Sequence, residues 1–575
     1  MYLEVLHVMS EHTTVGELIA AFLEQCGVQT TFGVISIHNM PILDAIGRRG
    51  NIRYVGARGE AGAVNMADGL ARVSGGLGVA FTSTGTAAGN AAGAMVEALT
   101  AGTTLLHITG QIETKYLDQD LTYIHEAPDQ LSMLKSISKA AYRVRTVETA
   151  LATVREAVRV ARTAPTGPVS VEIPIDIQAA HVPWPADMAP PHVTTLTHDT
   201  KRVEQLADAL AGAKRPLLWL GGGTRYAGSA VARLVALGFG VVSSVQGRGV
   251  LPEDHPATLG AFNVHPDVEA FYGTCDAMVV VGSRLRSNET LSYKLALPTP
   301  LYRIDADALA DNRGYKNALF VHGDASAILD QLATLLEGRL QIDPAFAGDL
   351  ATARDRAVGK VVDGLGPYKR LVEALQNALG RDYNWVRDVT VSNSTWGNRL
   401  LKVFTPRAGV HAMGGGIGQG AQMAIGAALS GVAQRTVCLV GDGGLKLNVG
   451  ELVTAVQEDA NVIFIVMNDQ CYGVIRNIQD AAYGARRMYV QLHQPDFAQF
   501  CGSFGLAHHR LSSLDQADAI FDKALSHKGP VMVEVDMLSI GTFKTTFAGP
   551  PVKEAHKDAD KDDHKDAVKS EQRDA

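Results

Sequence analysis

Cysteine is scarce in this sequence, and its spacing excludes two classes of site. The 575 residues contain five cysteines, which are scattered and form no CxxC pair. They are Cys26, Cys275, Cys438, Cys471 and Cys501. We therefore expect neither a disulfide framework nor a cysteine-based zinc site, and this cysteine usage fits a reducing compartment.

Long apolar runs and basic stretches are also missing. No continuous apolar run reaches the roughly 18 residues that a membrane helix needs. Residues 1–11 carry two acidic side chains and no long apolar core, which makes them a poor signal peptide. The formal net charge is -8 and no basic stripe is present, which argues against nucleic acid as a partner. The sequence therefore predicts a cytoplasmic protein that binds neither membrane nor nucleic acid.

Glycine, in contrast, is abundant: the chain has 58, as in α/β enzymes with many tight turns and phosphate-binding loops. Short apolar runs alternate with helical patterns along most of the chain. This alternation predicts an α/β fold of three domains, each with a central, mostly parallel sheet flanked by helices. The expected domains span residues 12–180, 195–340 and 366–545.

Composition also predicts the segments between and after these domains. Residues 180–198 are rich in proline and should form a linker. A looser segment at about 340–366 is expected to be a second linker. Residues 554–575 are almost entirely charged or alanine, which predicts a disordered tail; a helical lid is the alternative.

The segment from Gly441 to Cys471 predicts a site for a metal ion and a diphosphate. A turn, Gly441-Asp442-Gly443-Gly444, follows one buried strand, and Asp469 follows the next, 27 residues after Asp442. Ligands bind at such strand ends in α/β sheets, and glycine allows phosphate to approach the backbone. Asp442, Asp469 and the carbonyl of Cys471 could supply hard oxygen ligands to Mg²⁺. The alternative is an ordinary strand–helix turn without a ligand.

This segment resembles the thiamin-diphosphate signature, GDG followed after about 24–27 residues by a pair of asparagines. The resemblance implies that Gly441, Gly443, Gly444 and Asn468 contact the cofactor. It also implies that Asp442, Asp469 and Cys471 hold Mg²⁺, with Asp469 standing where asparagine is usual. Similarity to the acetolactate synthase, benzaldehyde lyase and oxalyl-CoA decarboxylase branch extends over roughly residues 12–545. In that branch a pyrimidine-binding domain, a middle domain and a diphosphate-binding domain follow one another.

The first expected domain carries the catalytic candidates. Its sequence RGEAGAVNMADGLAR is similar to the family pattern HEQxAxxxAxGxAR, which makes Glu60 the glutamate that binds the aminopyrimidine ring and promotes ylid formation. His125 stands where relatives place a Gln or Tyr facing the reacting carbonyl, although a histidine that only caps the loop is the alternative. Gln111 is a further candidate to line the site. His38 is a weaker candidate, for which a loop-ordering role is the alternative.

Two stretches of the third expected domain complete the implied cofactor site. The stretch HAMGGGIGQGAQMAIGAAL is similar to the one that holds the middle of the cofactor. The resemblance gives Ile417 the role of supporting the bent cofactor, with ordinary core packing as the alternative, and it gives the Gly415 carbonyl the 4′-amino group. Asn393 and Ser394 are candidates for diphosphate contacts.

For the middle domain, FAD, another nucleotide such as ADP or CoA, and no ligand are all open. A glycine-rich turn, LGGGTRYAG, follows an expected strand, and Arg284 and Arg286 could bind a phosphate.

The resemblance implies a thiamin-diphosphate enzyme that cleaves or forms C–C bonds of a 2-oxo acid, through ylid attack and an enamine-carbanion. This would be an acetolactate-synthase-like carboligase or a decarboxylase. A lyase acting on a 2-hydroxyacyl-CoA or a 2-hydroxyketone is one alternative, and a non-catalytic nucleotide-binding subunit is another. The resemblance also implies a homodimer or homotetramer with the active site between chains. Substrate identity is not legible, because the groups that select it lie on scattered loops.

Overall fold

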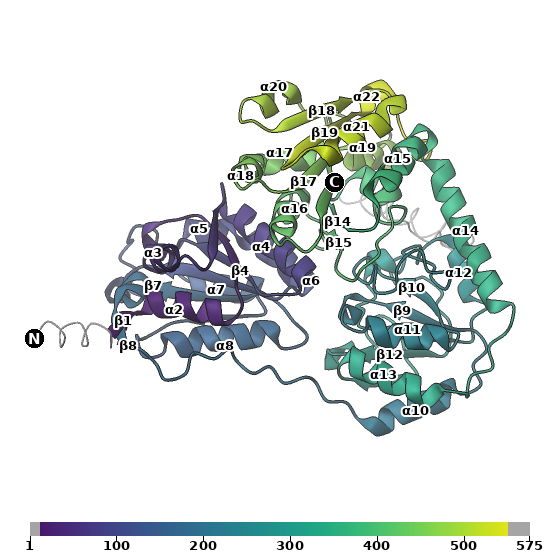
Figure 1. The fold of residues 1–575 in the computed structure, drawn as a ribbon, viewed down its shortest axis with the longest axis horizontal. Coiled ribbons are helices and arrows are strands. Elements are labelled where there is room, and N and C mark those ends of the chain that lie inside the picture. Colours follow the sequence, from purple (N-terminus) through teal and green to yellow (C-terminus); the bar gives the residue numbers. More distant parts are fainter. Residues whose placement is uncertain (1–11, 550–575) are drawn as a thin grey trace, which may run out of the picture.

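A computed structural model describes residues 12–549 of the chain, so the tail expected at 554–575 lies outside the described residues. The fold is α/β, and three sheets with parallel strands form the centres of three domains, as predicted (Figure 1). A small antiparallel pair is added, in which β1 (His12–Thr14) pairs with β8 (His181–Pro183). This pair places one end of the proline-rich segment beside the start of the first domain.

The first sheet has the strand order β3-β2-β4-β5-β7-β6. Alternate side chains of its buried strands point to opposite faces, as in any parallel sheet covered on both sides. Helices α2, α3 and α8 pack on one face, and α4 and α6 on the other. The strands are β2 (Thr30–Gly33), β3 (Arg53–Gly56), β4 (Gly78–Thr82), β5 (Leu105–Gln111), β6 (Ala140–Arg143) and β7 (Val169–Pro174). The helices are α2 (Val15–Gln25), α3 (Met40–Arg49), α4 (Glu60–Ser74), α5 (Thr86–Asn90), α6 (Ala92–Ala101), α7 (Gln130–Ile137), α8 (Ala150–Arg162) and α9 (Ile175–Ala179).

The middle sheet has the order β10-β9-β11-β12-β13. Its core includes fully buried runs such as AMVVV in β11, rich in the β-branched residues that favour strands. The strands are β9 (Pro216–Leu220), β10 (Gly240–Ser243), β11 (Ala277–Val281), β12 (Leu301–Asp305) and β13 (Leu319–His322). The helices are α10 (Thr200–Leu210), α11 (Gly228–Ala236), α12 (Pro266–Tyr272) and α13 (Ala325–Leu336).

The third sheet, ordered β15-β14-β16-β17-β19-β18, positions the candidate site. Its central strands β16 and β17 are buried over nearly their whole length, and because they pair in parallel, both end at the same edge of the sheet. The strands are β14 (Tyr383–Arg387), β15 (Gly409–His411), β16 (Arg435–Gly441), β17 (Val462–Asn468), β18 (Ala507–Leu511) and β19 (Val531–Asp536). The helices are α15 (Lys369–Leu379), α16 (Gly420–Leu429), α17 (Asp442–Leu447), α18 (Glu451–Gln457), α19 (Gly473–Ala482), α20 (Phe497–Gly502), α21 (Ala517–Ser526) and α22 (Met537–Ile540).

The expected loose linker at about 340–366 is wrong. These residues contain α14 (Phe346–Gly364), a helix of 19 residues. Phe346, Leu350 and the alanines at 353 and 357 are buried against the middle domain, at the spacing of one helix face. The chain between the middle and third domains is therefore a packed helix.

The first and third domains pack directly against each other through α4 and α16 (Figure 1). One buried cluster contains side chains of both helices, among them Met66 and Met423, so the two domains share a core. Glycine at positions 69 and 426 allows this close approach. A Cβ at either position would collide with a main-chain carbonyl group of the facing helix. Across the described residues, the helices lack an apolar stretch long enough to cross a bilayer.

Candidate active site

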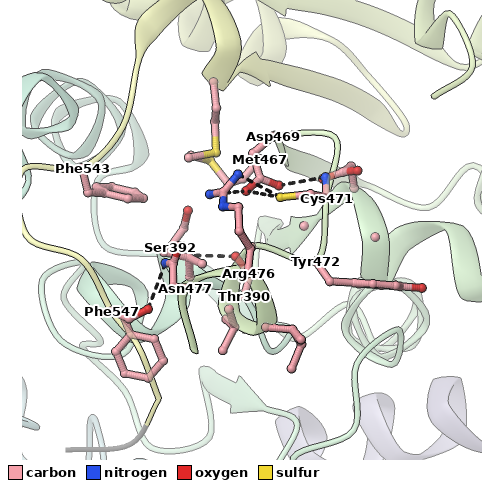
Figure 2. A pocket seen from close by; sticks show the side chains of 18 of the residues that line it. Thr390, Ser392, Met467, Asp469, Cys471, Tyr472, Arg476, Asn477, Phe543 and Phe547 are labelled. Atoms are coloured by element: carbon pink, nitrogen blue, oxygen red, sulfur yellow. Dashed lines mark hydrogen bonds and ion pairs between the residues drawn. The ribbon is translucent and has the colours of Figure 1, made fainter. Parts of the chain in front are cut away.

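A cavity of about 800 Å³ opens at the carboxyl ends of the strands in the third sheet (Figure 2). Eight of the residues singled out from the sequence line it: Gly415, Ile417, Gly441, Asp442, Gly443, Gly444, Asp469 and Cys471. They come from the turn after β16, the turn after β17 and the loop before α16. The parallel order of the strands brings these three turns to one edge, as the sequence analysis expected for a ligand site.

Asp442 is the most deeply buried acidic group of the cavity, with 1% of its surface exposed. Its Oδ2 accepts a hydrogen bond from Gln494 and lies 3.7 Å from Lys446 Nζ. Its Oδ1 is buried and has no hydrogen-bond partner within residues 12–549. Burial raises the pKa of Asp442 to about 6, and the negative charge of Asp469 contributes in the same direction. Asp442 therefore has a buried oxygen with unfilled lone pairs, and its charge interacts with that of Asp469, an arrangement that a cation would stabilise.

Asp469 differs from Asp442 in that both of its carboxylate oxygens have partners within the chain. Its Oδ2 accepts from Arg476 Nη2 at 3.2 Å and from the Cys471 thiol at 3.2 Å, and Figure 2 shows the three side chains together. Glycine at position 473 lets Asp469 keep this position, because a Cβ there would lie 2.5 Å from Asp469 Oδ2 and displace the carboxylate. The extra negative charge that Asp469 brings, relative to asparagine, is thus opposed by Arg476.

The sulfur of Cys471 has partners within the chain: its thiol donates to Asp469 Oδ2, and Arg476 Nη1 lies 3.0 Å from it. Burial, and then the neighbouring Asp469, raise the pKa of the thiol to about 12, so it stays protonated near neutral pH. Among the residues described, no group of three or more His, Cys, Asp or Glu side chains could hold a metal ion. A divalent cation here would depend on two carboxylates, a main-chain carbonyl and oxygens of a ligand or water, as Mg²⁺ often does.

The turn after β16 also fits a phosphate. A Cβ at Gly443 would lie 2.9 Å from the ring of Tyr472, and one at Gly444 would lie 3.2 Å from Asp388 Oδ2. Glycine at these positions lets Tyr472 and Asp388 pack directly against the turn, whose residues line the cavity. Together with the partnerless oxygen of Asp442, the turn from Gly441 to Gly444 fits a metal-bound diphosphate.

Three residues predicted to bind the cofactor lie elsewhere. Asn468 donates to Glu534 Oε1 at 2.8 Å and so faces the neighbouring strand β19. The buried Asn393 lies 3.4 Å from His411 Nδ1, and Ser394 lines a separate cavity of about 350 Å³. In their place, Thr390 and Ser392 line the main cavity.

Sequence reasoning also missed Arg476 and Gln494. Arg476 reaches Asp469 from the first turn of α19, and Gln494 reaches Asp442 from an irregular segment. For Thr390 and Ser392 a signal existed, because they follow β14 at the same sheet edge. No sequence spacing predicts the contacts of Arg476 and Gln494, because each contact depends on the conformation of a long side chain.

The catalytic candidates of the first domain form a second group. Glu60 begins α4 and is half-buried, and its Oε2 accepts from Asn90 Nδ2 at 3.1 Å. The rings of His38 and His125 meet edge to face, with 5.2 Å between their centroids. Burial, followed by the proximity of His125, lowers the pKa of His38. His125 is exposed and has a left-handed backbone, with φ of 67°.

Gln111 is held inside a buried polar network. Its Oε1 accepts from Thr84 Oγ1 at 3.0 Å and from the Ile112 N–H at 2.8 Å, and its Nε2 donates to Glu172 at 3.3 Å. With 2% of its surface exposed, Gln111 shapes the turns around it. None of Glu60, His38, Gln111 and His125 lines the cavity of the third domain in the same chain.

In the middle domain, the features considered for nucleotide binding make contacts within the chain. Gly221 and Gly223 pack against Gly282, where a Cβ would collide with main-chain atoms. Arg286 donates to the carbonyl of Thr100 and, at 3.1 Å, to that of Met413. Arg284 lies 3.5 Å from the same Thr100 carbonyl. The glycines thus have a packing role, and Arg286 ties three domains together.

Comparison with known protein families gives three matches along the chain. Residues 13–133 match the N-terminal TPP binding domain of thiamine pyrophosphate enzymes, 203–332 the central domain, and 390–535 the C-terminal TPP binding domain.

Similar proteins align over most of the chain. A probable 2-ketoarginine decarboxylase of Pseudomonas aeruginosa is 30% identical over 532 residues, covering 91% of this chain and 94% of that protein. A probable acetolactate synthase large subunit of Methanocaldococcus jannaschii is 26% identical and covers 90% and 91% of the two chains. The acetolactate synthase isozyme 1 large subunit of Escherichia coli is 27% identical and covers 91% and 93%.

Proposed function

Because this chain belongs to the thiamin-diphosphate enzymes of the acetolactate synthase family, we propose that it decarboxylates or ligates a 2-oxo acid. One observation carries the proposal: Asp442, with a buried oxygen that has no partner in the described residues, lines the same cavity as Asp469 and the glycine turn from Gly441 to Gly444. Such a site suits the metal-bound diphosphate of the cofactor. Membership of an enzyme family with this architecture sets aside the non-catalytic alternative.

The third domain would hold the cofactor. Asp442, Asp469 and the Cys471 carbonyl would bind Mg²⁺, and the turn from Gly441 to Gly444 would admit the diphosphate. When bound, the cofactor supplies an electron sink for the electron pair released by C–C cleavage. Ile417, at the mouth of the cavity with 36% of its surface exposed, would support the cofactor's middle.

The first domain would move protons. Glu60, oriented by Asn90, would hold a proton at the aminopyrimidine ring nitrogen. His38 and His125 lie beside each other at the carboxyl ends of the first sheet, where one could donate a proton to the substrate oxygen. Burial keeps His38 neutral near pH 7, which suits a hydrogen-bonding role for that ring.

The relatives favour a 2-oxo acid over the lyase alternative. The Pseudomonas aeruginosa protein is named for a 2-oxo acid, and the two others for acetolactate synthesis. A lyase acting on a 2-hydroxyacyl-CoA or a 2-hydroxyketone stays the second candidate. FAD or another nucleotide in the middle domain and a cytoplasmic location stay predictions, and flavin absorbance of the purified protein tests the first of these.

The Glu60→Gln variant tests the proposed chemistry. We expect the wild type, loaded with Mg²⁺ and thiamin diphosphate, to exchange the cofactor C2 proton at least about 100-fold faster than Glu60→Gln. Exchange into D₂O is followed by NMR. Glu156→Gln, which changes an exposed glutamate on α8, is the control and should exchange as the wild type does.

A screen of 2-oxo acids with mass detection of products then identifies the reaction. Aldehyde products indicate decarboxylation, and hydroxyketone products indicate ligation. Equal C2 exchange in the wild type and Glu60→Gln would show that Glu60 lacks the role proposed for it. Turnover of hydroxyacyl-CoA or hydroxyketone, without turnover of any 2-oxo acid, would favour the lyase.

A further inference from the structure

The loop between β15 and α16 carries two residues of the proposed cofactor site. Gly415 and Ile417 line the cavity from this loop. Residues 414–417 are exposed, and Gly415 has a left-handed backbone with φ of 79°. An exposed, glycine-rich loop loses much conformational freedom when it is fixed, so its position depends on how its two ends are anchored.

The first end is anchored by a carboxylate from another domain. Glu97 belongs to α6 of the first domain and has 1% of its surface exposed. Its Oε1 accepts from the Met413 N–H at 2.7 Å, and its Oε2 accepts from the Gly414 N–H at 2.6 Å. Both carboxylate oxygens therefore bind consecutive main-chain groups of the loop.

A buried arginine keeps this carboxylate ionised. Arg72 Nη2 lies 2.7 Å from Glu97 Oε1, and Arg72 Nη1 donates to the His411 carbonyl at 2.6 Å. The second ion pair of Arg72, to Asp68, fixes its position. Burial alone would raise the pKa of Glu97, but Arg72 and the two N–H donors outweigh it and lower the pKa. The anchor is thus a charged network in which each group has a partner.

Two further features of the loop, at positions 413 and 414, support its contact with Glu97. Glycine at position 414 permits this close approach, because a Cβ there would lie 2.9 Å from Glu97 Oε2 and displace the carboxylate. Met413 is also held at its carbonyl by Arg286, 3.1 Å away. Its N–H and its carbonyl are therefore bound by side chains of two different domains.

The other end of the loop has a matching anchor inside the third domain. Asp388 is fully buried, and its Oδ2 accepts from the N–H groups of Gly418 at 2.9 Å and Gly420 at 3.3 Å. The Gly418 carbonyl accepts from Asn448 at 2.9 Å. Gly415 and Ile417 thus lie between a carboxylate of the first domain and one of the third.

We propose that Glu97 is a positioning residue of the cofactor site, holding Gly415 and Ile417 in place across the boundary between the first and third domains. The proposal rests on the proposed function, because it assigns these two loop residues to the cofactor. It follows that the first domain contributes to cofactor binding in its own chain, apart from any catalytic group it supplies. Asp388 has the corresponding task at the other end of the loop.

The Glu97→Gln variant tests this inference, because a glutamine keeps the shape but turns an amide N–H₂ toward a main-chain donor. We expect its dissociation constant for thiamin diphosphate, measured by calorimetry with Mg²⁺, to rise about 10- to 100-fold, the usual cost of losing a charged hydrogen bond. The apparent KM for the cofactor should rise more than kcat at saturating cofactor falls. Amide exchange at residues 413–418 of the cofactor-free protein should also accelerate.

Two other variants keep the test decisive. Gly414→Ala disturbs the same contact from the exposed loop, so it serves if Glu97→Gln fails to fold, and the same weakening is expected. Glu253→Gln is the matched control, since Glu253 is 5% exposed, pairs with Arg248 at 2.7 Å and accepts from the Val403 N–H at 2.8 Å. It should leave cofactor affinity and loop exchange unchanged.

The outcomes separate this inference from the function. Wild-type affinity and wild-type loop protection in Gly414→Ala or Glu97→Gln would overturn the positioning role. If the wild type binds no thiamin diphosphate, the proposed function falls and the role toward a cofactor falls with it. In that case, faster amide exchange of the loop in Glu97→Gln would show only that Glu97 anchors the loop.

Discussion

The two carboxylates of the cavity differ in how far the chain itself fills their hydrogen-bonding capacity. Asp469 is paired with Arg476, whereas Asp442 keeps a buried oxygen without a partner in the described part of the chain. We expect Asp442→Asn to weaken Mg²⁺-dependent cofactor binding about 10- to 100-fold, because it removes the charge at the unfilled position. Asp469→Asn keeps an oxygen ligand and should weaken binding less than about tenfold.

Calorimetric titration of each variant with Mg²⁺ and cofactor makes this comparison. Asp330→Asn, at an exposed ion pair with Arg233 in the middle domain, is the control and should match the wild type. Equal losses in the two site variants would mean that the partnering of Asp469 by Arg476 has no bearing on metal binding.

His107 gives the molecule a defined sensitivity to acid. It is fully buried in β5 between Thr82 and Ser170, and burial lowers its pKa to about 4. Below pH 6.5 His107 binds a proton in the unfolded chain but stays neutral in the folded chain. The free energy of unfolding therefore falls as the pH is lowered, until the pKa of the folded state is reached. Between pH 6.5 and 5 the loss from this one residue is roughly 2 kcal/mol.

Denaturant unfolding at both pH values checks this expectation. The loss of stability on acidification should be smaller in His107→Asn by about that amount. An unchanged slope in His107→Asn would mean that the ring is protonated in the folded protein.

Among the elements, the packing of α4 on α16 depends on backbone rather than on side chains. A Cβ at Gly426 would collide with the Met66 carbonyl, so we expect Gly426→Ala to destabilise the protein by about 1–3 kcal/mol. Gly348→Ala in α14 is the control, because nothing lies within 4 Å of the added Cβ. It should stabilise by roughly 0.5–1 kcal/mol, since alanine restricts the unfolded chain. Thermal unfolding measures both, and a neutral Gly426→Ala would show that the helices can separate freely.

Site residues that directly follow a buried strand could be predicted from the sequence. Residues whose side-chain direction depends on the local winding of a helix could not. Asp442 and Asp469 follow two buried parallel strands, so their meeting could be inferred from the sequence. Ser392 and Asn393 are neighbours, but the π-helical turn Asn393–Gly397 decides that Ser392 lines the cavity. The helix α14 was missed because half of its buried stripe is alanine, which gives a weak apolar signal.

For the whole molecule, the separation of Glu60 from the cavity of its own chain has a direct test. Together with the resemblance, it leads us to propose a homodimer or homotetramer whose sites combine the first domain of one chain with the cavity of another. Exposed apolar side chains surround both regions, among them Ile37 and Ile124 near the histidines and Ile475 near the cavity. Such surfaces suit a contact between subunits.

Two impaired variants should then recover activity when mixed, at a cofactor concentration that leaves the Asp442→Asn chain unloaded. If Glu60→Gln and Asp442→Asn chains exchange subunits, half of the dimers are mixed and each mixed dimer has one complete site. We expect about a quarter of the wild-type rate with the 2-oxo acid found in the screen. Mixtures with Glu156→Gln in place of one variant calibrate the exchange. No recovery despite exchange would place Glu60 and the metal in the same chain.

The shared core of α4 and α16 also implies a delay during synthesis between the two helices that form it. The face of α4 around Met66 is made early, but the helix that covers it ends at Leu429. At about 5–20 residues per second, a ribosome needs roughly 20 to 70 s to bridge that interval. Throughout it, the nascent first domain carries an uncovered apolar helix while the middle domain is still being built. We therefore expect this face of the nascent chain to be open to chaperone binding until α16 has been made.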